Sequence, residues 1–180
     1  ADLFIETAKQ IATGLPEAQF LVPLVNRPTR ELFETALYRR EAHELNLTVL
    51  LGHAHEAMAA AAVVVAASGT ATLEAALLGR PVVITYRMPR LSWWIMSNLR
   101  YQPYVGLPNI LAGEFIVPEF LQDEATPENL SQAILNLMFD TTVRAGLEAR
   151  FAAMAQELRQ HSAERIASAL LPLIESGAAT

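Results

Sequence analysis

The sequence contains no cysteine and comparatively few charged residues, and these shortages rule out several kinds of protein. Without cysteine there is no disulfide framework and no thiolate metal site. Charged residues make up 18% of the 180 residues and the formal net charge is −6, so no basic stripe is available to bind nucleic acid. The longest unbroken apolar run, residues 57–67, is too short to span a bilayer. These features are compatible with the cytoplasm and predict that nucleic acid is not a partner.

Apolar residues, by contrast, are abundant, and their spacing predicts an α/β fold. They make up 52% of the sequence, enough for a single domain with a sizeable core. Short apolar runs bounded by turn residues predict strands at residues 19–25, 47–51, 63–67 and 82–86. Helical patterns lie around them at residues 3–13, from residue 28, at 56–61 and at 72–78. Because apolar strands that alternate with helices pair in parallel, we expect a Rossmann-like parallel sheet flanked by helices.

The last part of the chain is helical rather than alternating. Helices are predicted from Pro127 with Thr126 as N-cap, over residues 143–158 and over residues 163–174. We therefore expect a Rossmann-like domain over residues 1–140 and additional C-terminal helices over residues 141–180. An open α/β sheet normally begins with a strand, whereas this chain begins inside a helix, so we also expect the first strand to be missing.

Two hydroxyls and a glycine stand where the predicted strand 63–67 turns into a helix. Ligands of an open parallel sheet bind beyond the carboxyl ends of its strands, and the first amides of a helix attract anions. Gly69 would let a phosphate approach the backbone, while Ser68 and Thr70 can donate hydrogen bonds to it. Glu74, one turn later, can accept both hydroxyls of a ribose. The stretch favours a nucleotide diphosphate, with simple helix capping by Ser68 or Thr70 as the alternative.

Residues 104–113, "YVGLPNILAG", are apolar but show no helical or strand period. Loops of this kind usually pack against the body of the protein and are positioned for function. Asn109 follows a proline and allows two interpretations. It is either a turn residue, or a carboxamide that donates to a phosphate or orients a sugar hydroxyl.

His53 and His55 invite a metal hypothesis. Two histidines separated by one residue in a turn rarely converge on one ion without further ligands, so we expect no metal site here. The sequence indicates no cofactor either.

Both tryptophans of the chain lie in the segment 88–101. Trp93, Trp94, Ile95 and Met96 fall in one helical stretch, flanked by Arg87, Arg90 and Arg100. Tryptophan beside arginine suits a helix that lies in the interface of a membrane without crossing it. The alternative is that both tryptophans are buried against the sheet or another domain.

Four segments in this order resemble the lipid-A-disaccharide synthase family: "ASGTATLE", "GRPVVITYRM", "YVGLPNILAG" and "PEFLQ". The resemblance covers nearly the whole chain, and "LPNILAG" separates this family from other two-domain, GT-B type UDP-sugar transferases. Gly106 stands where the family motif usually has serine. The resemblance implies an inverting glycosyltransferase of lipid A and lipopolysaccharide biosynthesis. Such an enzyme moves 2,3-diacylglucosamine from UDP to the 6-hydroxyl of 2,3-diacylglucosamine 1-phosphate.

The resemblance also implies which residues meet the donor, and it places the chain in the C-terminal, nucleotide-binding half of such an enzyme. The diphosphate would meet Ser68, Gly69 and Thr70, and the ribose would meet Glu74. The further implied residues are Gly52 and His53 near the uracil, Asn109 as a residue needed for activity, and Glu119 and Gln122 at the donor sugar.

The implied partners are UDP-2,3-diacylglucosamine, the lipid acceptor and the cytoplasmic face of the Gram-negative inner membrane, where the protein would be peripheral. A homodimer is compatible with the sequence. An inverting transfer needs a general base and a cation that stabilises the departing UDP. The family's base and its phosphate-facing arginine match no residue of this chain, so we expect the 180 residues to be inactive alone.

Two other hypotheses remain open. Another UDP-sugar enzyme of the GT-B type, such as a murein-type transferase or a UDP-sugar epimerase, would keep the phosphate turn but would not need "LPNILAG". A nucleotide-binding module without catalysis would keep the fold but have no use for a donor-sugar pocket. UDP titration separates a plain scaffold from the enzymes, and sugar specificity separates transferase from epimerase.

Overall fold

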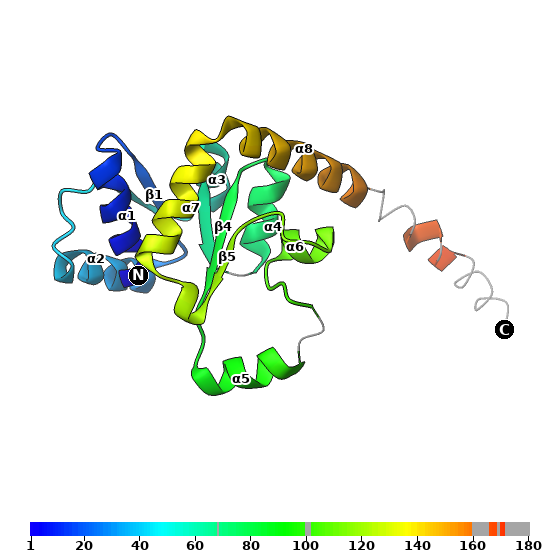
Figure 1. Cartoon of the computed structure of the whole chain (residues 1–180), viewed down its shortest axis with the longest axis horizontal. Coiled ribbons are helices and arrows are strands. Elements are labelled where there is room, and N and C mark those ends of the chain that lie inside the picture. The colour runs from blue at the N-terminus through cyan, green and yellow to red at the C-terminus, as the bar shows by residue number, and fades with distance from the viewer. Residues whose placement is uncertain (68, 100–101, 160–165, 169, 172–180) are drawn as a thin grey trace.

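The computed structural model describes residues 1–67, 69–99, 102–159, 166–168, 170 and 171, and it shows strands alternating with helices (Figure 1). The strands are β1 (Phe20–Leu24), β2 (Leu47–Leu51), β3 (Val64–Ala67), β4 (Val82–Tyr86) and β5 (Glu119–Leu121). The predicted bounds of β2 and β4 are confirmed without change. Both strands are short runs of apolar and β-branched residues, which suit a pleated, buried surface.

Helices connect and follow these strands. They are α1 (Asp2–Gly14), α2 (Arg27–Arg39), α3 (Ala54–Ala60), α4 (Thr70–Leu77), α5 (Arg90–Leu99), α6 (Leu107–Ala112), α7 (Pro127–Phe139) and α8 (Thr141–Leu158), with a 3₁₀ turn η1 (Gln122–Glu124). The predicted N-cap of α7 is confirmed, because the Thr126 side chain accepts a hydrogen bond from the Asn129 amide. The third predicted C-terminal helix, 163–174, lies mostly outside the described residues.

All strand pairing is parallel, which confirms the expected α/β class. The strands form two sheets, β1–β2 and β3–β4–β5, and no backbone hydrogen bond between the sheets is found among the described residues.

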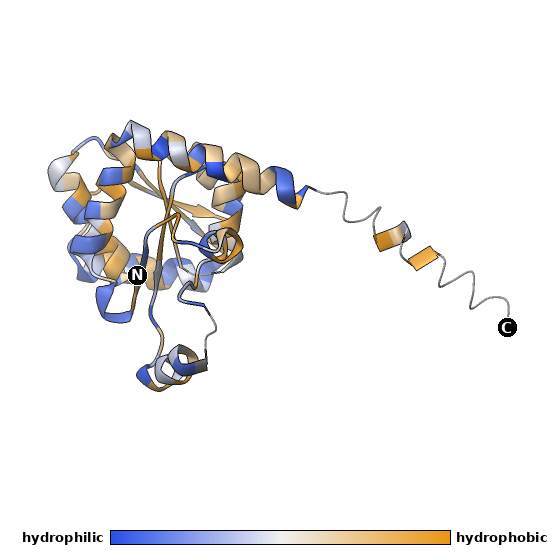
Figure 2. Ribbon diagram, turned by 45° about the vertical axis from the view of Figure 1, so that its right-hand side comes forward, coloured by the Kyte–Doolittle hydropathy of each residue, from blue (hydrophilic) through white to orange (hydrophobic). Residues whose placement is uncertain are grey.

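Helices on both faces hold the two sheets together. Ile5 of α1 packs with Phe33 of α2 against β1 and β2, whereas Ile11 of the same helix belongs to the core around β3 and β4. The strands of this core are among the most hydrophobic parts of the chain (Figure 2). Phe151 of α8 is 1% exposed in that core. The helix after residue 140 therefore shares its core with the sheet.

Helix α5 differs from the others in its position. Both views show it beyond one end of the sheet, and an extended segment joins it to β4 (Figures 1 and 2). This end is where β4 and β5 finish, since α5 follows β4 and η1 follows β5. The sheet thus carries α5 at the edge where ligands of parallel sheets bind.

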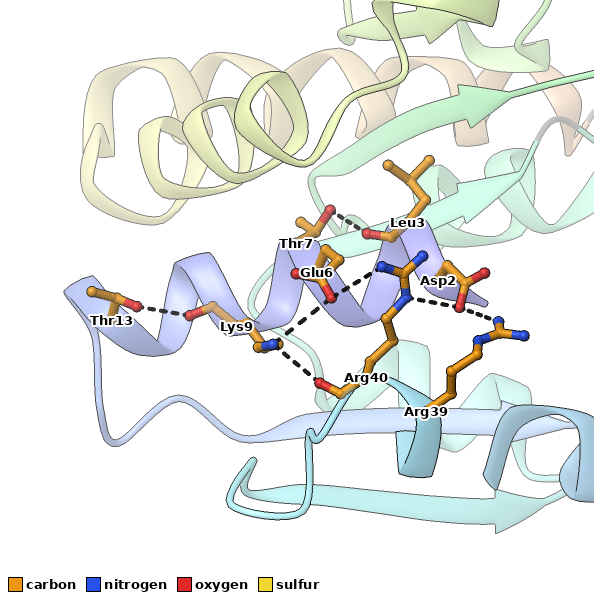
Figure 3. A network of polar contacts seen from close by, with 8 residues as sticks. All are labelled: Asp2, Leu3, Glu6, Thr7, Lys9, Thr13, Arg39 and Arg40. Atoms are coloured by element: carbon orange, nitrogen blue, oxygen red, sulfur yellow. Dashed lines mark hydrogen bonds and ion pairs between the residues drawn. The ribbon is translucent and has the colours of Figure 1, made fainter. Parts of the chain in front are cut away.

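A cluster of charged residues joins the start of α1 to the end of α2 (Figure 3). The Asp2 carboxylate accepts hydrogen bonds from Arg39 and, at 3.2 Å, from Arg40 Nε. Lys9 Nζ donates to the Arg40 carbonyl at 3.1 Å, and Arg40 Nη1 lies 3.8 Å from Glu6 Oε1. Hydrogen bonds from Arg39 and then Arg40 lower the pKa of Asp2 from 3.8 to about 2.

This cluster predicts a pH dependence of stability. A carboxyl whose pKa is lower in the folded state stabilises the fold above its unfolded value, here 3.8, and loses that contribution as pH falls through about 2. We expect the difference in unfolding free energy between wild type and Asp2→Asn to shrink over this range in urea titrations. If the difference in unfolding free energy stayed constant down to about pH 2, Asp2 would not have the lowered pKa in the folded state. The effect should be small, because the pair is exposed and water screens it.

Candidate functional site

Five of the predicted ligand-binding residues follow the carboxyl ends of three strands. Gly52 and His53 come directly after β2, Gly69 and Thr70 follow β3 within three residues, and Gln122 follows β5. Helix α4 contacts both α3 and α6, so the segments after β2, β3 and β4 are packed together. Ser68 lies outside the described residues.

The turn from β3 into α4 contains a glycine in a conformation that other residues rarely adopt. Gly69 is the N-cap of α4 and has a φ of 139°, which favours glycine over any other residue. No side-chain capping bond is found in the described part of this turn. Thr70 is already the first helical residue, so it is not the N-cap of this helix. Thr72 is buried, and its hydroxyl donates to the Gly69 carbonyl at 2.7 Å, which stabilises the turn.

Glu74 is paired with a residue that sequence reasoning considered only as a metal ligand. Its Oε1 lies 3.1 Å from His55 Nδ1, and this contact joins α4 to α3. His53 Nδ1 lies instead 3.5 Å from Glu56 Oε1. A hydrogen bond from its own backbone, and then one from His53, lower the pKa of Glu56. The two histidines thus contact different carboxylates, and no metal-binding group of three or more such side chains is found in the described ranges.

The turn between β2 and α3 is held in an unusual backbone conformation. Gly52 has a φ of 74° and His53 a φ of 57°, so two successive residues are left-handed. A non-glycine residue rarely adopts this region, and such residues occur often at functional sites. The Gly52 amide donates to the Leu24 carbonyl at 2.8 Å and is therefore already bonded within the protein.

Asn109 is fully buried, and its carboxamide is completely hydrogen-bonded within the protein. Its Nδ2 donates to the Val117 carbonyl at 2.9 Å and to Glu119 Oε1 at 2.8 Å. Its Oδ1 accepts from the amides of Ile116 at 2.8 Å and Val117 at 2.9 Å. A carboxamide has two donor hydrogens and two acceptor positions, so none remains for a ligand in this structure. The bonding supports a positioning role for Asn109 rather than direct donation.

Glu119 binds the segment that begins α6. Besides Asn109, its two oxygens accept from the amides of Val105 at 2.9 Å and Gly106 at 2.8 Å. The segment 104–113 was expected to be a non-periodic loop, and this expectation is corrected: residues 107–112 form α6. A Cβ on Gly106 would lie 2.1 Å from Ile84 Cδ1, so glycine is the residue that fits beside the buried Ile84.

Gln122 is also engaged inside the protein. Its side-chain amide pairs with the backbone of Met88, accepting from the amide at 2.7 Å and donating to the carbonyl at 3.0 Å. Gln122 has a positive φ of 50°, which is uncommon for a residue with a side chain. Met88 lies two residues before α5, so Gln122 joins the end of β5 to the backbone just before that helix.

The four residues predicted to meet a membrane lie on α5. Trp94 is 65% exposed and Ile95 is 45% exposed, whereas Trp93 and Met96 are half-buried. The structure thus corrects the alternative in which both tryptophans are core residues of this chain. Across the described residues, no helix has the length and apolar character needed to cross a membrane.

Comparisons with known proteins agree with the sequence pattern. The family model "Lipid-A-disaccharide synthetase" matches residues 1–171. The chain is 52% identical over 175 residues to the lipid-A-disaccharide synthase of Methylobacillus flagellatus, covering 97% of this chain and 46% of the relative. The corresponding enzyme of Pseudomonas aeruginosa is 41% identical over 173 residues, covering 96% of this chain and 44% of the relative. The chain spans less than half the length of these curated relatives, and it belongs to the lipid-A-disaccharide synthase family.

Proposed function

We propose that this chain is the donor-binding part of an inverting glycosyltransferase of lipid A biosynthesis. The reaction would transfer 2,3-diacylglucosamine from its UDP donor to 2,3-diacylglucosamine 1-phosphate and release UDP. The observation that carries the proposal is an identity of 41–52% to lipid-A-disaccharide synthases over nearly the whole chain. The general base and the phosphate-facing arginine would come from the rest of a full-length enzyme, so these residues alone should bind the donor without turning it over.

The N-terminus of α4 would hold the diphosphate of the donor. Gly69 leaves the backbone open to a close approach, and the first amides of α4 carry no side-chain cap among the described residues. The N–H groups at the start of a helix and the positive end of its dipole favour an anion at this position. Thr70 and Ser68 would add hydroxyl hydrogen bonds to the same phosphates.

Glu74 would bind the ribose, and Gly52 and His53 would lie beside the uracil. A carboxylate suits the ribose because it can accept hydrogen bonds from two neighbouring hydroxyls. The contact between Glu74 and His55 supports this arrangement, since it joins α3, which begins directly after His53, to α4.

Three residues would position the segments that surround the donor sugar without contacting it: Asn109, Glu119 and Gln122. Glu119 and Asn109 together hold the start of α6, and Gln122 holds Met88, just before α5. The Glu119 carboxylate accepts hydrogen bonds from three N–H groups. Hydrogen bonds to charged groups are worth about 1.5–3 kcal/mol each, so these bonds hold the start of α6 firmly.

Helix α5 would meet the cytoplasmic face of the inner membrane, from which acylated substrates must be drawn. Its exposed Leu91, Trp94 and Ile95 would enter the lipid interface beside the cationic Arg90. The formal net charge of the chain is −6, so attraction to anionic lipid has to come from local cations such as Arg90. This attraction should weaken as salt is added.

The proposal is tested by UDP binding to the full-length protein. We expect Glu74→Ala to weaken UDP binding about tenfold or more, because a charge-assisted hydrogen bond to the ribose is lost. Binding of inorganic phosphate should change much less, because Glu74 would contact the ribose and not the phosphates. Glu148→Ala, which removes an exposed carboxylate from α8, is the matched control. Equal UDP affinity of Glu74→Ala and wild type, measured by calorimetry, would refute the ribose assignment.

A further inference from the structure

Four hydrogen bonds between residues 87–88 and 122–125 hold the backbone just before α5. Two of these bonds pair the Gln122 side chain with the backbone of Met88, at 2.7 and 3.0 Å. In the other two, Arg87 Nε donates to the Gln122 carbonyl at 3.2 Å and Arg87 Nη2 donates to the Ala125 carbonyl. We call this group the Arg87–Gln122 joint.

The joint continues the sheet after its backbone ladder has ended. The last paired residues of β4 and β5 are Tyr86 and Leu121. The chain then turns at Gln122, whose left-handed φ of 50° leads the backbone into η1. The side-chain amide of Gln122 bonds both the N–H and the C=O of Met88, so hydrogen bonding between the two segments extends two residues beyond Tyr86. A strained residue of this kind persists when surrounding contacts hold it.

Arg87 has a different role from the one that its neighbours in the sequence suggest. It was expected to be one of the cations flanking the apolar helix, available to lipid headgroups. In the structure its guanidinium donates to two backbone carbonyls, at Gln122 and Ala125. The planar guanidinium suits this task because its donors form a rigid fork, whereas a lysine offers one point charge.

The joint lies directly before α5 in the chain. The helix begins at Arg90, two residues after Met88, so the joint fixes the backbone just before its first turn. Leu91 is 71% exposed and Trp94 is 65% exposed, so packing against the body restrains the helix little at these positions. Both views show α5 apart from the layers formed by the sheet and the other helices (Figures 1 and 2).

We propose that Arg87 and Gln122 are positioning residues, which aim α5 so that its exposed apolar side chains receive the acyl chains of a lipid-linked sugar at the ends of β4 and β5. The acylated nature of the ligand rests on the proposed function, whereas the control of α5 by the joint does not. Neither residue needs to touch the reacting atoms.

The test uses the full-length protein with Arg87→Met, which keeps an aliphatic stem and removes both donated bonds. Amide hydrogen exchange over residues 88–99 is expected to become about tenfold faster or more, since the segment opens locally once its braces are lost. The KM for the diacylated donor presented on vesicles should rise about fivefold, while kcat and the affinity for free UDP change less than about twofold. Arg30→Met is the matched control, because Arg30 forms an exposed ion pair with Glu34 on α2, at 2.6 Å.

Two further variants make the test specific. Gln122→Glu keeps the length and the acceptor for the Met88 amide but loses the donor to the Met88 carbonyl, so an intermediate rise in exchange is expected. Arg87→Lys retains the charge and one donor; it should restore part of the protection, and it also serves if Arg87→Met does not fold.

Three results would overturn the inference. Unchanged exchange in Arg87→Met would show that the joint does not restrain α5. Faster exchange with an unchanged KM on vesicles would show that the direction of α5 does not serve substrate capture. A loss of UDP affinity in Arg87→Met would place Arg87 in the nucleotide site instead. If the wild-type protein bound no UDP, the proposed function would fail together with the acyl ligand, and the exchange result would still decide the joint.

Discussion

Asn109→Ala is expected to lower the free energy of unfolding by about 3 kcal/mol or more and to cut turnover of the full-length enzyme about a hundredfold. The substitution removes the partner of the amide and carbonyl of buried Val117 and of the amide of half-buried Ile116. Each buried group left unpaired costs about 1–3 kcal/mol. Turnover should fall because Glu119 also loses a donor and the start of α6 is held less firmly.

The two effects are separated by measuring urea unfolding and kcat of the folded fraction on the same samples. Asn136→Ala is the control, since Asn136 is exposed on α7 and accepts one bond from Gln132. Lost turnover with unchanged stability would favour direct contact between Asn109 and the substrate, against the positioning role. Lost stability with normal turnover of the folded fraction would reduce Asn109 to a structural residue.

The double variant Trp93→Ala with Trp94→Ala should weaken partitioning of the full-length protein into anionic vesicles about thirtyfold or more. Each large apolar side chain that moves from water into an apolar environment contributes about 1.5–3 kcal/mol, and two such losses multiply in the partition coefficient. The free energy of unfolding should change by less than about 1 kcal/mol from the loss of Trp94, which is 65% exposed.

Sedimentation with vesicles at low and high salt measures this partitioning. The control is Leu32→Ala with Tyr38→Ala, which removes two exposed apolar side chains from α2. We expect the control to bind vesicles like the wild type, and we expect wild-type binding to weaken as salt screens Arg90. Unchanged vesicle binding together with a large loss of stability would show that the tryptophans stabilise the fold instead.

The strands and most helices could be predicted because their signals are local. The bounds of β2 and β4 follow directly from short apolar runs between turn residues. Thr126 and Pro127 mark the start of α7 by their own chemistry. Helix α6 was missed for the opposite reason. Its six residues have no amphipathic period, and the backbone before it is held by Glu119, thirteen residues beyond Gly106.

By itself, the sequence determined the α/β class, the family and the placement of Gly69, Thr70 and Glu74 at a strand-to-helix turn. These conclusions depend on residue types and spacings within short segments, which are legible without coordinates. Only the tertiary structure decided how the polar side chains are used. Asn109 is occupied by residues 116–119, Gln122 by Met88, and Glu74 by His55. Each of these bonds joins residues seven to thirty-four positions apart, and such distant pairs meet only when the chain has packed.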